Sequence, residues 1–179
     1  MNPILNKNFF LVKEKIGMFK ASNNYDIFDP ENNHQIMTTK EVGLGFFTKM
    51  FRFTDYKRNT PFNVVVTTPE GKPIVSIKRG IAIFRSDVEV FDENNRTIDT
   101  HDKHLCTLEG KWTGWDFKFN KDGKELAHVS KKWAGIGKEF FTSADNYVLQ
   151  INETVLQDAP IRPLILAAVM CIDMVLKEK

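Results

Sequence analysis

The chain has 179 residues, of which 42% are hydrophobic and 27% charged, with a mean hydropathy of −0.32 and a formal net charge of +2. This length predicts one domain with a sizeable core, and so small a net charge gives little support for a nucleic-acid-binding protein. The chain's two cysteines, Cys106 and Cys171, exclude a disulfide framework and a paired CxxC motif. They therefore favour a reducing compartment over secretion.

The N-terminus predicts a cytoplasmic protein without a leader. Residues 1–8 are expected to form a short tail, and residues 9–179 a single domain. No basic region followed by an apolar core is present at the N-terminus, so we expect no signal peptide. Myristoylation requires a glycine after the initiator methionine, and this position is Asn2.

Short apolar or alternating segments, separated by polar turns, predict β-strands along most of the chain. Trp115, Phe117 and Phe119 point to one side of such a strand, and the polar residues between them to the other. Gly43–Tyr56 fits one side of a helix better than a strand. The predicted strands are Phe9–Lys15, Tyr25–Asp29, His34–Glu41, Phe62–Thr68, Pro73–Lys78, Ile81–Phe84, Val88–Phe91, Leu105–Glu109, Trp115–Asn120, Lys124–Ser130, Lys138–Thr142 and Tyr147–Ile151.

The segment Leu164–Leu176 predicts a helix that is apolar on every side, interrupted only by Asp173. Such a helix must be buried in protein or lipid. A bilayer span needs about 20 apolar residues, so a run this short favours a buried core helix. We place the helix at about 159–177, with Asp158 as its N-cap. Asp173 and Lys177 have the spacing of a helical ion pair, which predicts that Asp173 lies near a mouth of the surrounding sheet.

A mainly β fold satisfies both patterns, namely an antiparallel closed barrel of roughly twelve strands around the buried hydrophobic C-terminal helix. Closure removes the open edges of the sheet, and inward-facing aromatic residues would contact the helix on all sides. Stranded barrels with a central helix are a known architecture.

Three segments resemble the phospholipid scramblase family. Val129–Ile151 (VSKKWAGIGKEFFTSADNYVLQI), followed by the apolar helix with Ile172–Asp173, is similar to the end of that family, and Asn23–Asn33 and Thr60–Gly80 are similar to its opening strand and central hairpin. The resemblance covers about Asn23–Leu176. It implies the tubby-like barrel of the tubby and LURP-one-related superfamily, and a membrane-associated protein that binds phospholipid head groups or moves phospholipids between leaflets. The family's palmitoylated cysteine cluster is absent, because the corresponding segment, IAIFRSDVEV, has no cysteine.

Clustered basic residues are the candidate lipid-binding site. If the strands bring two groups together, they form a patch for phosphate or an anionic lipid surface, to which each cation contributes about 1 kcal/mol. The alternative interpretation is solvated strand ends. The resemblance favours lipid, because tubby relatives bind phosphoinositides through basic residues. The candidates are Lys78, Arg79, Arg85, Lys131, Lys132 and Lys138.

The resemblance also implies a calcium loop, aligned with Ser143–Thr154. An EF-hand-like loop needs oxygen ligands at its first, third and fifth positions and a bidentate acid at the twelfth. Here the fifth position is Tyr147 and the twelfth Thr154, which leaves Asp145, Asn146 and Glu153 as calcium candidates. The alternation of this segment favours a β-strand instead, and no other cofactor is expected.

The remaining motifs argue against a conventional enzyme. His101, His104 and Cys106 are zinc-type ligands, but their spacing matches no common finger, and a polar loop is the better interpretation. No nucleophile elbow, P-loop or dinucleotide fingerprint is present.

Two functions stay open, and the oligomeric state cannot be predicted. The first is peripheral binding to an anionic phospholipid surface, with or without scrambling; the second is a soluble regulatory or ligand-binding module. The short helix favours peripheral binding over spanning, because Asp173 in lipid would cost about 2.5–3.5 kcal/mol.

Overall fold

The fold is one ten-stranded antiparallel sheet and a C-terminal helix. The computed structural model describes residues 1–15, 24–42, 61–79, 88–98, 105–111, 114–131 and 146–177. Its elements are the 3-10 helix η1 (Pro3–Asn6), the strands β1 (Phe9–Glu14), β2 (Tyr25–Phe28), β3 (Gln35–Glu41), β4 (Phe62–Thr67), β5 (Pro73–Arg79), β6 (Val88–Phe91), β7 (Thr107–Lys111), β8 (Asp116–Lys121), β9 (Lys124–Ser130) and β10 (Tyr147–Ile151), and the helix α2 (Ile161–Lys177).

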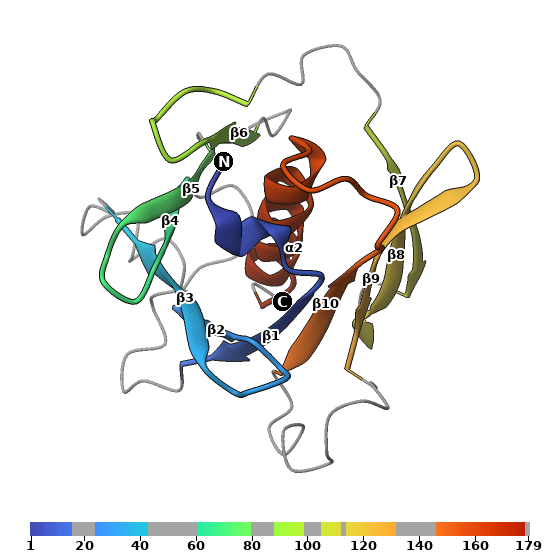
Figure 1. Cartoon of the computed structure of the whole chain (residues 1–179), viewed down its shortest axis with the longest axis horizontal. Helices are drawn as coiled ribbons and strands as arrows, with labels where there is room; N and C mark the ends of the chain where they lie inside the picture. Colours follow the sequence, from blue (N-terminus) through green and yellow to red (C-terminus); the bar gives the residue numbers. More distant parts are fainter. Residues whose placement is uncertain are drawn as a thin grey trace.

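The sheet curves around α2 (Figure 1). Its strand order is β6-β5-β4-β3-β2-β1-β10-β9-β8-β7, so the N-terminal strand β1 pairs with the last strand, β10. The mainly β class with one C-terminal helix is confirmed. Among the described residues no pairing joins the two edge strands, β6 and β7. Closure into a barrel therefore stays a prediction, and the expected strands at 81–84 and 138–142, like segment 43–56, lie outside the described residues.

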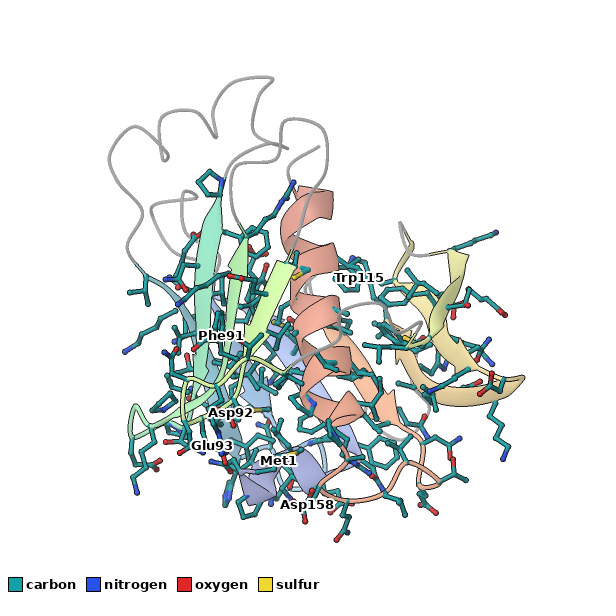
Figure 2. The ribbon with its side chains drawn as sticks, turned by 90° about the horizontal axis from the view of Figure 1, so that it is seen from above. Met1, Phe91, Asp92, Glu93, Trp115 and Asp158 are labelled. Carbon is teal, nitrogen blue, oxygen red and sulfur yellow. The ribbon has the colours of Figure 1, made fainter. Side chains whose placement is uncertain are left out.

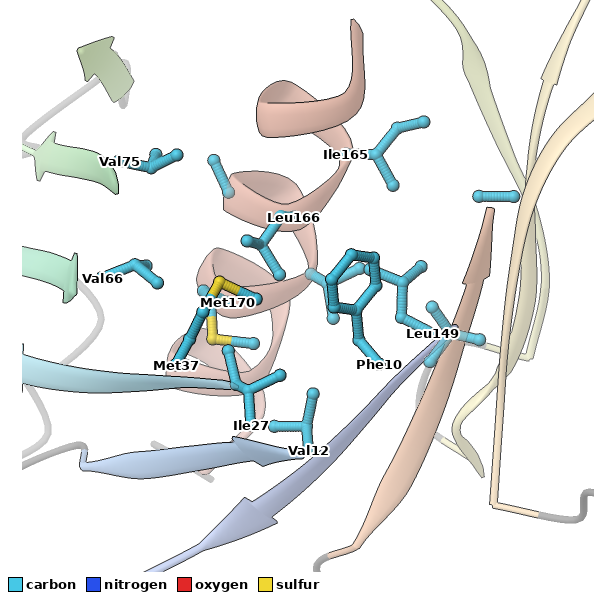
Figure 3. Packing of buried hydrophobic residues seen from close by; sticks show 14 of the residues in the cluster. Phe10, Val12, Ile27, Met37, Val66, Val75, Leu149, Ile165, Leu166 and Met170 are labelled. Atoms are coloured by element: carbon cyan, nitrogen blue, oxygen red, sulfur yellow. The ribbon is translucent and has the colours of Figure 1, made fainter. Parts of the chain in front are cut away.

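The core lies between α2 and the concave side of the sheet. Leu166 and Met170 of α2 pack among strand residues that include Phe10, Ile27 and Met37 (Figure 3). All five of these side chains are buried. The apolar C-terminal helix thus packs inside the curve of its own chain's sheet, as the sequence predicted, but one stripe of it stays half-buried.

Sheet topology defines two ends of the molecule. The last residue of β10, Ile151, lies beside Asn8, just before β1, and the chain then turns into α2. Even-numbered strands therefore run toward the end where α2 begins, and odd-numbered strands toward the end where α2 ends, because every pairing is antiparallel. We name them the start end and the finish end of α2. Met1 and Asp158 both lie at the start end (Figure 2).

The start end differs from the expectation in two ways. Residues 1–8 are not a free tail, because Pro3–Asn6 form η1 and Leu5, only 2% exposed, joins the core. Asn2 caps this turn by accepting a hydrogen bond from the Ile4 amide. Asp158 is not the N-cap of α2. It lies three residues before Ile161 with φ 60°, and its side chain and amide bond Asn6.

Candidate functional site

The predicted basic residues that the structure describes all lie at the finish end of α2. Lys78 and Arg79 are the last residues of β5, and Lys131 follows β9. Six antiparallel pairings separate β5 from β9, so the two strands run in the same direction and end at the same end. Five strands lie between them, and Figure 1 shows them on opposite sides of α2. The two groups thus share an end of the molecule without forming one compact patch.

Each of these three cations lies over an aromatic ring. Lys78 Nζ is 4.4 Å from the ring centroid of Phe91, and Arg79 Cζ is 5.7 Å from that of Phe62. Lys131 Nζ is 5.9 Å from the Trp115 ring. A cation over a ring gains about 0.5–1 kcal/mol at an exposed site, so the rings favour defined positions for these charges. Arg85, Lys132 and Lys138 lie outside the described residues.

A buried polar cluster lies under this end, around Asp173 of α2. Asp173 lies in the last two turns of α2, toward the finish end, and its side chain is 0% exposed. Burial raises the pKa of Tyr25 well above its usual value, and the negative charge of Asp173 and a hydrogen bond to it act in the same direction. Burial, followed by the charges of Asp173 and Glu14, likewise raises the pKa of Tyr147.

The aromatic side of this cluster reaches β8. The Trp115 ring stacks on Tyr147 at a centroid distance of 4.1 Å and an interplanar angle of 15°. The Tyr147 hydroxyl is buried and has no hydrogen-bond partner among the described residues. Lys131 lies over the Trp115 ring of this stack. The cluster therefore connects the buried Asp173 carboxylate with Lys131, a predicted lipid-binding cation. The sequence marked Asp173 as unusual, but the two tyrosines are typical strand residues and gave no such signal.

An apolar groove runs between the two edges of the sheet, with α2 as its floor. It encloses about 350 Å³. β6 forms one wall, and Leu105 and Cys106, which precede β7, form the other together with Phe119 of β8. The helix contributes half-buried residues, which recur every three or four positions, and the buried residues Ile165 and Ala167. The main lining residues are Val88, Val90, Leu105, Cys106, Phe119, Ile161, Leu164, Ala168, Cys171 and Ile172.

Comparison with known families decides the identity of the chain. A model of the Scramblase family matches residues 24–179. This chain is a member of the Scramblase family. A curated relative is Altered inheritance rate of mitochondria protein 25 of Saccharomyces cerevisiae, 24% identical over 83% of this chain; the match spans 60% of the yeast protein's length. A solved structure of an Arabidopsis thaliana protein is similar over 93% of this chain and 89% of that one, at 14% identity and a TM-score of 0.49.

Two of the three calcium candidates of this scramblase-family chain lie at opposite ends of a strand. Segment 147–151 is the strand β10, as the alternation predicted. Asn146 precedes β10 at the finish end, and Glu153 follows it at the start end. Five extended residues span about 16 Å, whereas calcium ligands lie at about 2.3–2.6 Å from the ion. Asn146 and Glu153 therefore cannot bind the same ion, and Asp145 lies outside the described residues, where its role stays a prediction.

Two further predictions for this scramblase-family member concern metal binding and membrane spanning. His101 and His104 lie outside the described residues, and among those described no group of three or more His, Cys, Asp or Glu side chains could hold a metal. Within the described part of the chain, no helix is both long and apolar enough to cross a bilayer.

Proposed function

We propose that this scramblase-family protein binds anionic phospholipid head groups peripherally, with the finish end of α2 toward the membrane. The observation that carries the proposal is the common direction of β5 and β9, which brings Lys78, Arg79 and Lys131 to one end. Membership in the Scramblase family supports a lipid as the partner.

Two separated basic groups suit a flat partner. A single phosphate needs its cations close to one another. A flat lipid surface, in contrast, can contact the cations on both sides of α2 at the same time. Each cation near an anionic surface contributes about 1 kcal/mol, within a Debye length of the charges. The remaining predicted cations belong to the segments that connect β5 with β6 and β9 with β10; they are Arg85, Lys132 and Lys138.

Peripheral binding leaves α2 inside the sheet. Scrambling by a membrane-spanning α2 would require the helix to leave the core and would place Asp173 in hydrocarbon, which costs about 2.5–3.5 kcal/mol on insertion scales. The buried contacts of Leu166 and Met170 would be lost as well. The proposed activity is therefore head-group binding, and any transfer of lipid between leaflets would proceed with α2 in place.

The experiment is co-sedimentation with vesicles of phosphatidylcholine containing phosphatidylserine, compared with phosphatidylcholine alone. Lys78→Glu/Lys131→Glu is expected to weaken binding to the anionic vesicles at least about 30-fold, because the loss of two cations costs about 1 kcal/mol each and the two added carboxylates repel the surface. The matched control is Lys72→Glu/Lys124→Glu, which makes the same charge change in two exposed turns at the start end. The control is expected to bind within about twofold of the unmodified protein.

Two results would contradict the proposal. An equal loss in both double variants would show that net charge, and not the finish end, governs binding. Equal binding to anionic and neutral vesicles would favour the second function, a soluble regulatory or ligand-binding module of the same superfamily.

A further inference from the structure

We propose that the apolar groove between β6 and the β7–β8 edge holds one acyl chain of an anionic phospholipid. This inference rests on the proposed function and names the part of the lipid that leaves the bilayer plane. The groove differs in its chemistry from Lys78 and Lys131, neither of which lines it, so the two can be tested separately.

The lining has the composition of a chain-binding site. Its side chains are aliphatic or aromatic except for the thiols of Cys106 and Cys171, and no charged side chain lines it among the described residues. Its volume of about 350 Å³ lies within the range of roughly 300–1,000 Å³ typical of small-ligand sites. An occupant without polar groups along its length fits such walls, because a buried polar group without a partner is costly.

The length of the groove matches one leaflet. The half-buried stripe on α2 runs from Ile161 to Ile172, through Leu164, Ala168 and Cys171. At 1.5 Å per residue this stripe is about 16 Å long. Half of a typical hydrocarbon core is about 15 Å, which is the depth that one acyl chain occupies in a leaflet. One extended chain would therefore cover the stripe from end to end.

The charged end of the groove suits an anionic amphiphile. The groove lies between β6 and the segment before β7, which are not paired with each other among the described residues. Arg79 lies at its finish end: it is the register partner of Val88, and its charge acts on the thiol of Cys171. An anionic head group at Arg79 would leave the chain to run along α2 toward the start end.

The test uses the two native thiols, which are the chain's only cysteines and both line the groove. Burial raises the pKa of Cys171 to about 12 and also raises the pKa of Cys106, so both thiols react slowly with N-ethylmaleimide and their rates can be compared with and without lipid. The probe is monomeric lysophosphatidylserine, below its micelle concentration. Mass spectrometry measures the rate of alkylation at each cysteine, and we expect the lipid to slow both rates at least fivefold. Glycerophosphoserine, which is the head group alone, is expected to give no protection.

A filled groove provides the second measurement. Ala168→Phe places a ring in the groove and is expected to weaken lysophosphatidylserine binding at least tenfold. Leu156→Phe is the matched control, because Leu156 is 77% exposed and does not line the groove. Far-ultraviolet circular dichroism and thermal unfolding establish that both variants fold.

The outcomes separate the two proposals. No protection of either thiol, or equal protection by glycerophosphoserine, overturns the groove as a chain site even if vesicle binding is intact. Protection that persists in Lys78→Glu/Lys131→Glu, together with unchanged vesicle binding by that variant, supports the groove and refutes the role of the basic residues.

Discussion

The two ends of α2 are built from different interactions. At the start end, charged and polar groups are paired within tight turns and around the N-terminal segment. At the finish end, a carboxylate and two tyrosines are buried, and cations at the ends of β5 and β9 lie over aromatic rings. The contrast indicates that the start end fixes the helix in the sheet, and the finish end is the one to which the proposed lipid binding is assigned.

Arg162 is the centre of the start end. It is 1% exposed, and its guanidinium donates hydrogen bonds of 2.7–3.2 Å to oxygens on both sides of α2's first turn. These bonds tie the N-terminal segment to the loop before the helix. The acceptors are the carbonyl oxygens of Leu5, Lys7, Val155 and Leu156 and the side-chain oxygen of Asn8.

Carboxylates of the start end are stabilised as anions. Burial alone would raise the pKa of Asp29, but hydrogen bonds from the Lys7 ammonium and the Glu31 amide hold it below its usual value. The pKa of Asp92 is lowered by the Arg96 amide and further bonds in the same turn. The finish end shows the opposite behaviour, because its two tyrosines are held in their neutral form.

The largest expected effect is the loss of the start-end network. Arg162→Met should reduce the free energy of unfolding by about 3–5 kcal/mol, because it leaves several buried oxygens without donors. Urea unfolding followed by circular dichroism measures the change. The matched control is Arg96→Met, which removes an exposed ion pair with Asp92 and should cost at most about 1 kcal/mol. Equal losses in the two variants would remove the distinction between the start end and an ordinary surface turn.

Alkaline pH tests the finish end. Because the pKa of Tyr147 is raised in the folded state, the folded state keeps the hydroxyl proton longer than the unfolded state. That contribution is complete below pH 10, the usual tyrosine value, and falls by about 1.4 kcal/mol per pH unit above it. Tyr147→Phe should match the unmodified protein near pH 7 and lose less stability between pH 10 and 11, as measured by urea unfolding. Parallel pH profiles for the two proteins would show that Tyr147 ionises freely in the fold.

The sequence predicted the elements better than their arrangement. Short apolar or alternating segments mark the strands that the structure describes, and the uniform apolar character of α2 predicts its burial. The same uniformity means that the sequence does not predict the groove. Leu164 and Ala168 are half-buried and Leu166 and Met170 are fully buried, but all four are apolar residues in the same run.

The position of the candidate site could be found only from the order of the strands in the sheet. Lys78 and Lys131 come to one end only because β1 pairs with β10, a contact between opposite parts of the chain that no local pattern predicts. Asp158 shows the limit of local rules in another way. Its residue type suits an N-cap, but bonds to Asn6, 152 residues away in sequence, position it outside the helix.

The orientation of the protein on the membrane can be measured directly by amide hydrogen exchange with phosphatidylserine-containing vesicles. The finish end is expected to be protected: exchange should slow at Arg79 and Lys131 and stay unchanged in the start-end turns at 68–72 and 121–124. Slowing confined to those turns, or spread evenly over both ends, would contradict the assignment of the membrane-binding surface to the finish end of α2.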